Sequence, residues 1–123
     1  MSRHTTIAAS PLVLARVAGW GLVAAIVILS VVPAPLRPET SLPHHLEHFA
    51  IYFATGLAFA LGYSLMPLLA TLLVMFSGAV EILQLFIPGR HARLSDFIVD
   101  ALASVVGLMT VLLVAQMRNR TRA

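Results

Sequence analysis

The longest uncharged run in the chain, 33 residues from His48 to Val80, is too long for a single membrane span. A helix crosses the hydrocarbon core of a bilayer with about 20 apolar residues. Pro67 lies near the middle of the run, and proline is tolerated at the start of a helix but not in its interior. The run therefore predicts two consecutive membrane-crossing helices joined by a tight turn.

Composition also indicates a membrane protein. Hydrophobic residues make up 59% of the 123 residues and charged residues 11%, and the mean hydropathy is +0.94. A soluble domain carries about 25% charged residues, and disordered chains are poor in apolar residues. The composition therefore excludes a soluble single-domain enzyme and a disordered chain, and the length allows one domain over residues 1–123.

Two further apolar runs complete the predicted architecture. The first contains one charge, Arg16, whose side chain can reach the interface. This run exceeds the ~7–15 apolar residues of a cleavable signal peptide, and a proline-rich linker follows it. The last run begins after Ser95, with Asp96 as the expected N-terminal cap. We expect an all-α integral membrane bundle of four transmembrane helices, at about residues 11–32, 46–66, 67–87 and 96–117.

The basic residues predict the orientation. All eight are arginines, and they lie near the ends of the apolar runs, so we expect no nucleic-acid partner. Five fall on the side of the termini (Arg3, Arg16, Arg118, Arg120 and Arg122) and three on the other side (Arg37, Arg90 and Arg93). Because cytoplasmic loops carry the excess of basic residues, we expect both termini on the cytoplasmic side of the inner (plasma) membrane. The chain has no cysteine, which excludes thiol chemistry.

Small residues predict how the helices pack. Lipid provides no hydrophobic drive for helix association, so membrane helices approach each other through small residues. Such residues recur every four positions at Ala50, Ala54, Ala58 and Gly62 in the second helix and at Ala103 and Gly107 in the fourth. We interpret both sets as packing faces.

Polar residues recur on one face of three predicted helices, at spacings of three or four residues that place side chains together. The sets are His48, Tyr52 and Thr55; Ser77, Glu81 and Gln84; and Asp96, Asp100 and Ser104. The alternating directions of the helices bring these sets to one level near the outer interface. We therefore predict an outward-facing polar pocket made of His48, Tyr52, Glu81, Gln84, Arg90, Arg93, Asp96 and Asp100.

The predicted depth of Glu81 in the membrane indicates that the pocket has a partner or a function. A carboxylate at mid-span costs about 2.5–3.5 kcal/mol on insertion scales, so Glu81 needs a partner or a function. One alternative is a structural ion pair with Arg90 or Arg93 that only fixes the helix register. In addition, four carboxylates outnumber these two arginines at this level. Such an excess must bind a proton, a cation or a cationic ligand group.

A metal site is a further alternative. His48 and Glu81, with Asp96 or Asp100, would offer the nitrogen and oxygen ligands that suit zinc, manganese or magnesium. No recognised metal-binding signature supports such a site. We therefore expect no metal or cofactor, and we interpret His44, His45 and His91 as solvated loop residues. For Asp96, a helix cap is the alternative to a role in the pocket.

The spaced residues Glu81, Gln84, Pro88-Gly89-Arg90 and Asp96 resemble the pattern of the VanZ-like membrane protein family. The resemblance covers about residues 42–107, and His48 and Gly107 also align with positions of the pattern. The chain departs from it at three places: His44-His45 replaces an acidic-Lys pair, Asp100 replaces asparagine, and Ala103 replaces the first glycine. The founding member of the family is associated with lowered susceptibility to the glycopeptide teicoplanin. The resemblance therefore implies a cell-envelope role but no particular reaction.

Three functions are compatible with the sequence. In the first, the pocket binds an anionic lipid-linked headgroup or another envelope ligand, gripped by Arg90 and Arg93. In the second, the protein is an enzyme acting on a lipid phosphate, with His48 or Glu81 as general acid/base. In the third, it is a small transporter or a structural subunit, although its halves show no internal repeat. We favour the first, and the expected partner is a membrane lipid or lipid-linked envelope precursor.

Overall fold

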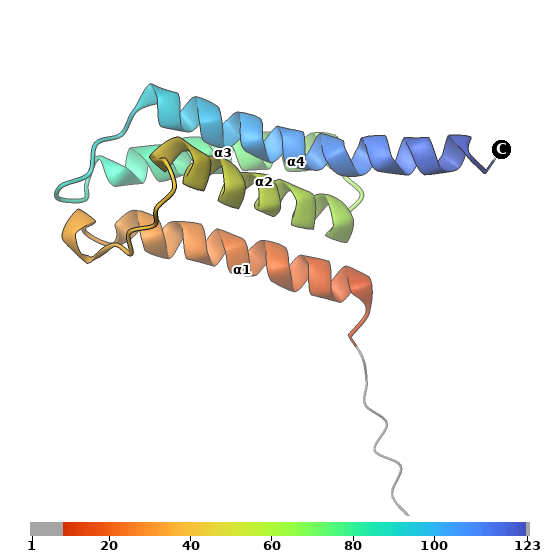
Figure 1. Ribbon diagram of the computed structural model, residues 1–123, viewed down its shortest axis with the longest axis horizontal. Helices are drawn as coiled ribbons and strands as arrows, with labels where there is room; N and C mark the ends of the chain where they lie inside the picture. The colour runs from red at the N-terminus through yellow and green to blue at the C-terminus, as the bar shows by residue number, and fades with distance from the viewer. Residues whose placement is uncertain (1–8, 123) are drawn as a thin grey trace, which may run out of the picture.

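The computed structural model describes residues 9–122, and every regular element in this part of the chain is helical (Figure 1). Arg3, one of the five arginines on the side of the termini, lies outside the described residues. The helices α1, α3 and α4 are long and apolar enough to cross a membrane, which indicates a membrane protein; α2 is not among them. The elements are α1 (Pro11–Val31), the short 3₁₀ helix η1 (Ala34–Leu36), α2 (His44–Gly62), α3 (Met66–Gln84) and α4 (Leu94–Arg120).

Several predicted helix ends were wrong by two to four residues. Helix α2 starts directly after Pro43, so that His44 and His45 form its first turn instead of belonging to a loop. It ends at Gly62, and the Tyr63–Leu65 segment forms the connection to α3. The α-helical part of α3 ends at Gln84, because the next three N–H groups bond to carbonyls three residues earlier. Helix α4 is longer than predicted at both ends, and its N-cap is Arg93, not Asp96.

Helix α2 is the central packing element and lies against α1 and α4. Two glycines allow the closest approach: a Cβ at Gly56 would collide with the carbonyl oxygen of Ser104, and one at Gly107 would collide with that of Phe53. The predicted small-residue face is therefore correct for Gly107. It is wrong for Ala50, which is exposed, and Gly56 takes part in its place.

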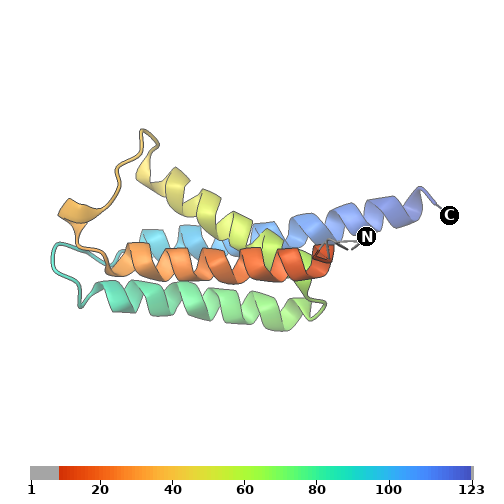
Figure 2. The ribbon, with the colours of Figure 1, turned by 90° about the horizontal axis from the view of Figure 1, so that it is seen from below.

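The two ends of the bundle differ in charge. The C-terminus of α1, the linker 32–43, the N-termini of α2 and α4 and the C-terminus of α3 lie at one end, which we call the linker end (Figure 1). The N-terminus of α1 and the C-terminus of α4 lie at the other end, which we call the basic end. Figure 2 shows the first turns of α2 diverging from α1 and α3 at the linker end, while α4 extends beyond the other helices at the basic end. All five carboxylates of the chain lie toward the linker end.

Candidate functional site

The three polar sets face the interior of the bundle, as their spacing predicts. Eight of their nine residues are buried, and His48, with 13% of its side chain exposed, is the exception. The hydroxyls of Thr55, Ser77 and Ser104 donate to backbone carbonyls of their own helices. These three side chains are therefore satisfied locally, and the candidate site lies closer to the linker end.

His48 and Asp100 form the most deeply buried charged contact. The imidazole Nδ1 of His48 lies 3.0 Å from Oδ1 and 3.2 Å from Oδ2 of Asp100. Asp100 is completely buried, so its carboxylate depends on this neighbour for compensation. A carboxylate that accepts from one ring nitrogen fixes the tautomer of the imidazole and leaves the other nitrogen for a ligand.

Asp96 has a different role from the predicted helix cap. It is the third residue of α4, and its carboxylate oxygens lie 3.5 Å from Nε2 of His44 and 3.4 Å from Nδ1 of His45. These two histidines remain about half-exposed, but they contact a buried carboxylate across the α2–α4 interface. Their interpretation as unattached loop residues was therefore wrong. His91 does lie in a loop and is exposed.

Glu81 stands apart from the His48 pair. Its Oε2 accepts a hydrogen bond from the backbone N–H of Arg93, 3.1 Å away, at the N-cap of α4. Glu81 of α3 thus accepts from the N-cap N–H of α4, and Asp96 does not act as the cap. Among the described residues, Glu81 forms no ion pair with Arg90 or Arg93. Glu81 and Arg93 line a cavity of about 320 Å³ between α3 and α4. The prediction that all eight polar residues share one chamber was wrong in this respect.

Arg90 attaches the α3–α4 loop to the end of α1. Its guanidinium donates to the carbonyl of Leu29 and, over 3.0 Å and 3.4 Å, to the carbonyl of Val32. These carbonyls belong to the last turn and the C-cap of α1, where basic groups are favourable because backbone oxygens lack helical donors. Burial, and secondly the charge of Arg37, lowers the pKa of the Arg90 guanidinium. Arginine nevertheless stays protonated in proteins, so two cations face each other at this point.

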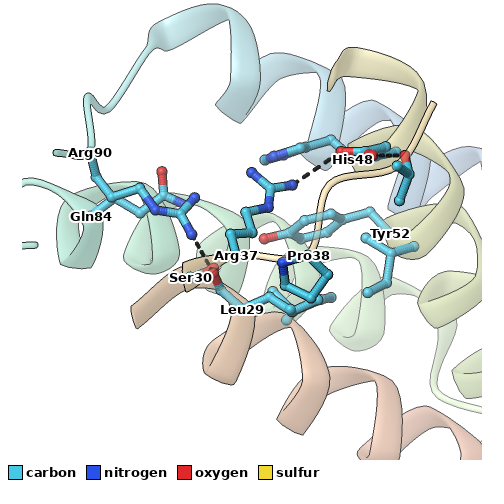
Figure 3. A pocket seen from close by; sticks show the side chains of 12 residues that line it. Leu29, Ser30, Arg37, Pro38, His48, Tyr52, Gln84 and Arg90 are labelled. Atoms are coloured by element: carbon cyan, nitrogen blue, oxygen red, sulfur yellow. Dashed lines mark hydrogen bonds and ion pairs between the residues drawn. The ribbon is translucent and has the colours of Figure 1, made fainter. Parts of the chain in front are cut away.

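The main candidate site is a cavity of about 280 Å³ beneath the linker, which we call the linker cavity. Figure 3 shows Arg37 and Arg90 entering it from the linker and from the α3–α4 loop, with the Tyr52 hydroxyl pointing toward the two guanidinium groups. His48 and Gln84 also line this cavity. Within the described chain, two buried side-chain oxygens lack a hydrogen-bond partner, and they are the Tyr52 hydroxyl and Oε1 of Glu81.

A second cavity adjoins the first on the loop side and measures about 510 Å³. The two cavities share six residues, among them Arg37, Glu47 and Arg90, while His44 and Asp96 line only the second. The structure thus brings His48, Tyr52, Gln84 and Arg90 together, and it places Arg93 and Asp96 along the adjoining cavity.

Sequence reasoning missed Arg37 as a site residue. Its guanidinium is 3.2 Å from the Glu47 carboxylate, which also accepts from the Thr40 hydroxyl. The arginine count places Arg37 on the same side of the membrane as Arg90 and Arg93, but the charge balance of the predicted pocket includes only the latter two. Arg37 lies in an irregular linker, where no periodic pattern marks a residue as buried. Only its position on the same side of the membrane as Arg90 and Arg93 could have suggested that it belongs to the site.

Over residues 9–122, no three side chains of histidine, cysteine, aspartate or glutamate are arranged so that they could hold a metal ion. No family model, curated protein or solved structure matches the chain. Fold and site together define a small helical membrane protein with a polar cavity at one end, lined by two arginines.

Proposed function

We propose that the chain is a VanZ-like integral membrane protein whose linker cavity binds an anionic group of a lipid-linked envelope ligand. The observation that carries this proposal is the convergence of Arg37, Arg90 and the unpartnered Tyr52 hydroxyl on one cavity. The proposed cellular role is in the cell envelope, including an effect on susceptibility to glycopeptides. This role rests on the resemblance of the spaced Glu81, Gln84, Arg90 and Asp96 to the family pattern.

Charge is the first argument for an anion. Arg37 and Arg90 bring two positive charges to this partly buried space and Glu47, paired with Arg37, brings one negative charge, so one further anion would balance them. A guanidinium has five N–H donors, and the hydrogen bonds of Arg90 to α1 use only its Nε and one terminal nitrogen. Arginine matches the oxygens of phosphate and carboxylate by paired hydrogen bonds. The ligand group is therefore a phosphate or a carboxylate.

The apolar part of the cavity wall supports a lipid-linked ligand. Ile26, Leu29 and Ile51 line the cavity beside the polar groups. The buried Tyr52 hydroxyl lies close to the Asp100 carboxylate but forms no hydrogen bond of good geometry, so it can donate to a ligand or a water. A ligand with an anionic head and an apolar tail satisfies both parts of the wall.

The proposed topology has four spans, with both termini in the cytoplasm. Helix α2 has 19 residues, which corresponds to about 28 Å of length and is close to the thickness of the hydrocarbon core. It packs between α1 and α4, and its exposed polar first turn, which diverges from α1 and α3, would lie at the membrane interface. The linker end would then face outward, where envelope ligands are found.

The proposal is tested by binding of a long-chain prenyl phosphate, with the uncharged prenol as the comparison ligand. The protein is purified in a maltoside detergent, and affinity is measured by microscale thermophoresis. We expect the phosphate to bind more tightly than the alcohol, and Arg37→Gln to weaken phosphate binding about tenfold or more. Hydrogen bonds to charged groups contribute about 1.5–3 kcal/mol, and 1.4 kcal/mol corresponds to a tenfold change.

Two further variants separate the roles of the residues around Arg37. Glu47→Gln removes the carboxylate that holds Arg37, so it should keep or strengthen phosphate binding. Arg118→Gln removes the same charge at the far end of α4 and should leave binding unchanged. Equal affinity for the phosphate and the alcohol, or equal losses in Arg37→Gln and Arg118→Gln, would contradict the proposal.

One observation favours a second candidate function, the hydrolysis of a lipid phosphate. His48 lines the linker cavity while Asp100 orients its ring, an arrangement that suits a general base. In this alternative, His48 takes a proton from water, the water oxygen attacks phosphorus, and the bond from phosphorus to the lipid oxygen breaks. The lipid oxygen takes a proton from solvent, and His48 returns its proton to solvent. Of the two acid/base candidates, His48 and Glu81, only His48 lines the linker cavity. Release of inorganic phosphate by the purified protein, abolished in His48→Gln, would favour hydrolysis over binding alone.

A further inference from the structure

A cavity larger than the linker cavity lies toward the basic end. It measures about 950 Å³ and is formed by α1, the end of α2, α3 and α4. Its wall is mostly apolar, with residues such as Val23, Leu69, Leu72 and Val111. We call it the basic-end groove, and its shape and lining fit a hydrocarbon chain.

Arg16 lies along this groove in a fixed position. Its Nε donates to the carbonyl of Gly62 over 2.8 Å, and its guanidinium carbon is 4.8 Å from the centre of the Tyr63 ring. The Tyr63 hydroxyl in turn accepts from the indole N–H of Trp20 over 3.1 Å. Tryptophan, tyrosine and arginine are the residues that anchor helices at the level of lipid headgroups. The terminal nitrogens of Arg16 are therefore available for a headgroup at the rim of the groove.

The charge of this end determines which headgroup fits. Arg118, Arg120 and Arg122 lie at the end of α4, which extends past the other helices (Figure 2). Among the described residues, the basic end has no aspartate or glutamate. Clusters of basic residues next to a membrane helix attract anionic lipid headgroups.

We propose that the basic-end groove binds one anionic phospholipid, with an acyl chain along the apolar wall and its phosphate on Arg16. The site is separate from the linker cavity, and its occupant belongs to the opposite leaflet. The proposal does not depend on the ligand of the linker cavity.

Trp20 makes the proposal testable without an added label. It is the only tryptophan of the chain and lines the groove. Bromine atoms on an acyl chain quench tryptophan fluorescence on contact. The protein is reconstituted into vesicles that contain equal amounts of phosphatidylglycerol and phosphatidylcholine, with only one of the two brominated. We expect brominated phosphatidylglycerol to be preferred at Trp20 by about fivefold, the factor given by one arginine near an anionic headgroup.

Two variants with the same net charge locate the source of the preference. Arg16→Gln removes the charge at the groove and should abolish the preference. Arg118→Gln removes a charge outside the groove and should retain most of it. Equal quenching by both brominated lipids in the unchanged protein would overturn the proposal. Equal loss of the preference in both variants would also overturn it, because it would show a general surface-charge effect.

Discussion

Arg90 serves the fold and the proposed site at the same time. Its guanidinium bonds to the carbonyls of Leu29 and Val32 at the end of α1, and it also lines the linker cavity. Arg37 forms only a partly exposed ion pair with Glu47, and such pairs contribute about 0–1 kcal/mol. The two arginines should therefore respond differently to substitution.

Arg90→Ala should lower the free energy of unfolding by about 1–3 kcal/mol, because two partly buried carbonyls lose their donor. Arg37→Gln should change it by less than about 1 kcal/mol. Both values are obtained from thermal or denaturant-induced unfolding in detergent. A larger destabilisation in Arg37→Gln than in Arg90→Ala would contradict the roles assigned to these residues. For the same reason, a loss of cellular function in Arg90→Ala has to be compared with the abundance of the protein.

Periodicity predicted the residues that are fixed by helix geometry. Spacings of three or four residues placed His48, Tyr52 and Asp100 on inward-facing helix faces, and these faces are buried. The pairing of His48 with Asp100 was not predicted. The contribution of Arg37 could not be predicted in this way, because the path of an irregular linker depends on tertiary contacts. Glu81 was placed on the correct buried face, but the pattern could not show that it turns toward the backbone N–H of Arg93.

At the scale of elements, the close contact of α2 with α4 determines the site. Gly56 and Gly107 let the two backbones touch, and this contact brings His48 near Asp100. The sequence predicted four transmembrane helices from apolar run lengths; residues 9–122 contain four α-helices, and three of them are long and apolar enough to cross a membrane. It did not identify Gly56, since spacing indicates which residues share a face but not which face meets which neighbour.

Gly56→Ala should destabilise the protein by about 1–3 kcal/mol, because the new methyl group collides with backbone of α4 that cannot move alone. Gly21→Ala is the matched control, since a Cβ there has no neighbour within 4 Å. It should leave stability unchanged or raise it slightly, because alanine favours helix more than glycine. Thermal unfolding followed by circular dichroism measures both. Similar melting temperatures for the two variants would show that α2 and α4 do not pack as described.

At the scale of the whole molecule, charge divides the bundle into a mixed end and a basic end. The linker end contains the carboxylates together with Arg37, Arg90 and Arg93, and the described part of the basic end contains only arginines as charged residues. This asymmetry supports the proposed orientation, with the linker cavity on the outside.

Single cysteines test the orientation without interference, because the chain has no native cysteine. His91→Cys lies in the exposed α3–α4 loop, and Asn119→Cys lies near the end of α4. In intact spheroplasts, a membrane-impermeant maleimide should label the first and not the second, while lysis should make both reactive. The reverse labelling pattern would place the linker cavity on the cytoplasmic side.

The most direct test of anion binding in the linker cavity is the proximity of a ligand phosphorus atom to arginine side chains. Solid-state NMR can measure this proximity as dephasing of ¹⁵N-labelled guanidinium signals by ³¹P, with a prenyl phosphate bound and no phospholipid added. We expect guanidinium signals to be dephased in the unchanged protein. This dephasing should be lost for the Arg37 signal in Arg37→Gln, become weaker in Arg90→Lys and persist in Arg118→Gln. Absence of dephasing, or dephasing that is unchanged in Arg37→Gln and Arg90→Lys, would show that the two-arginine cavity is not the binding site.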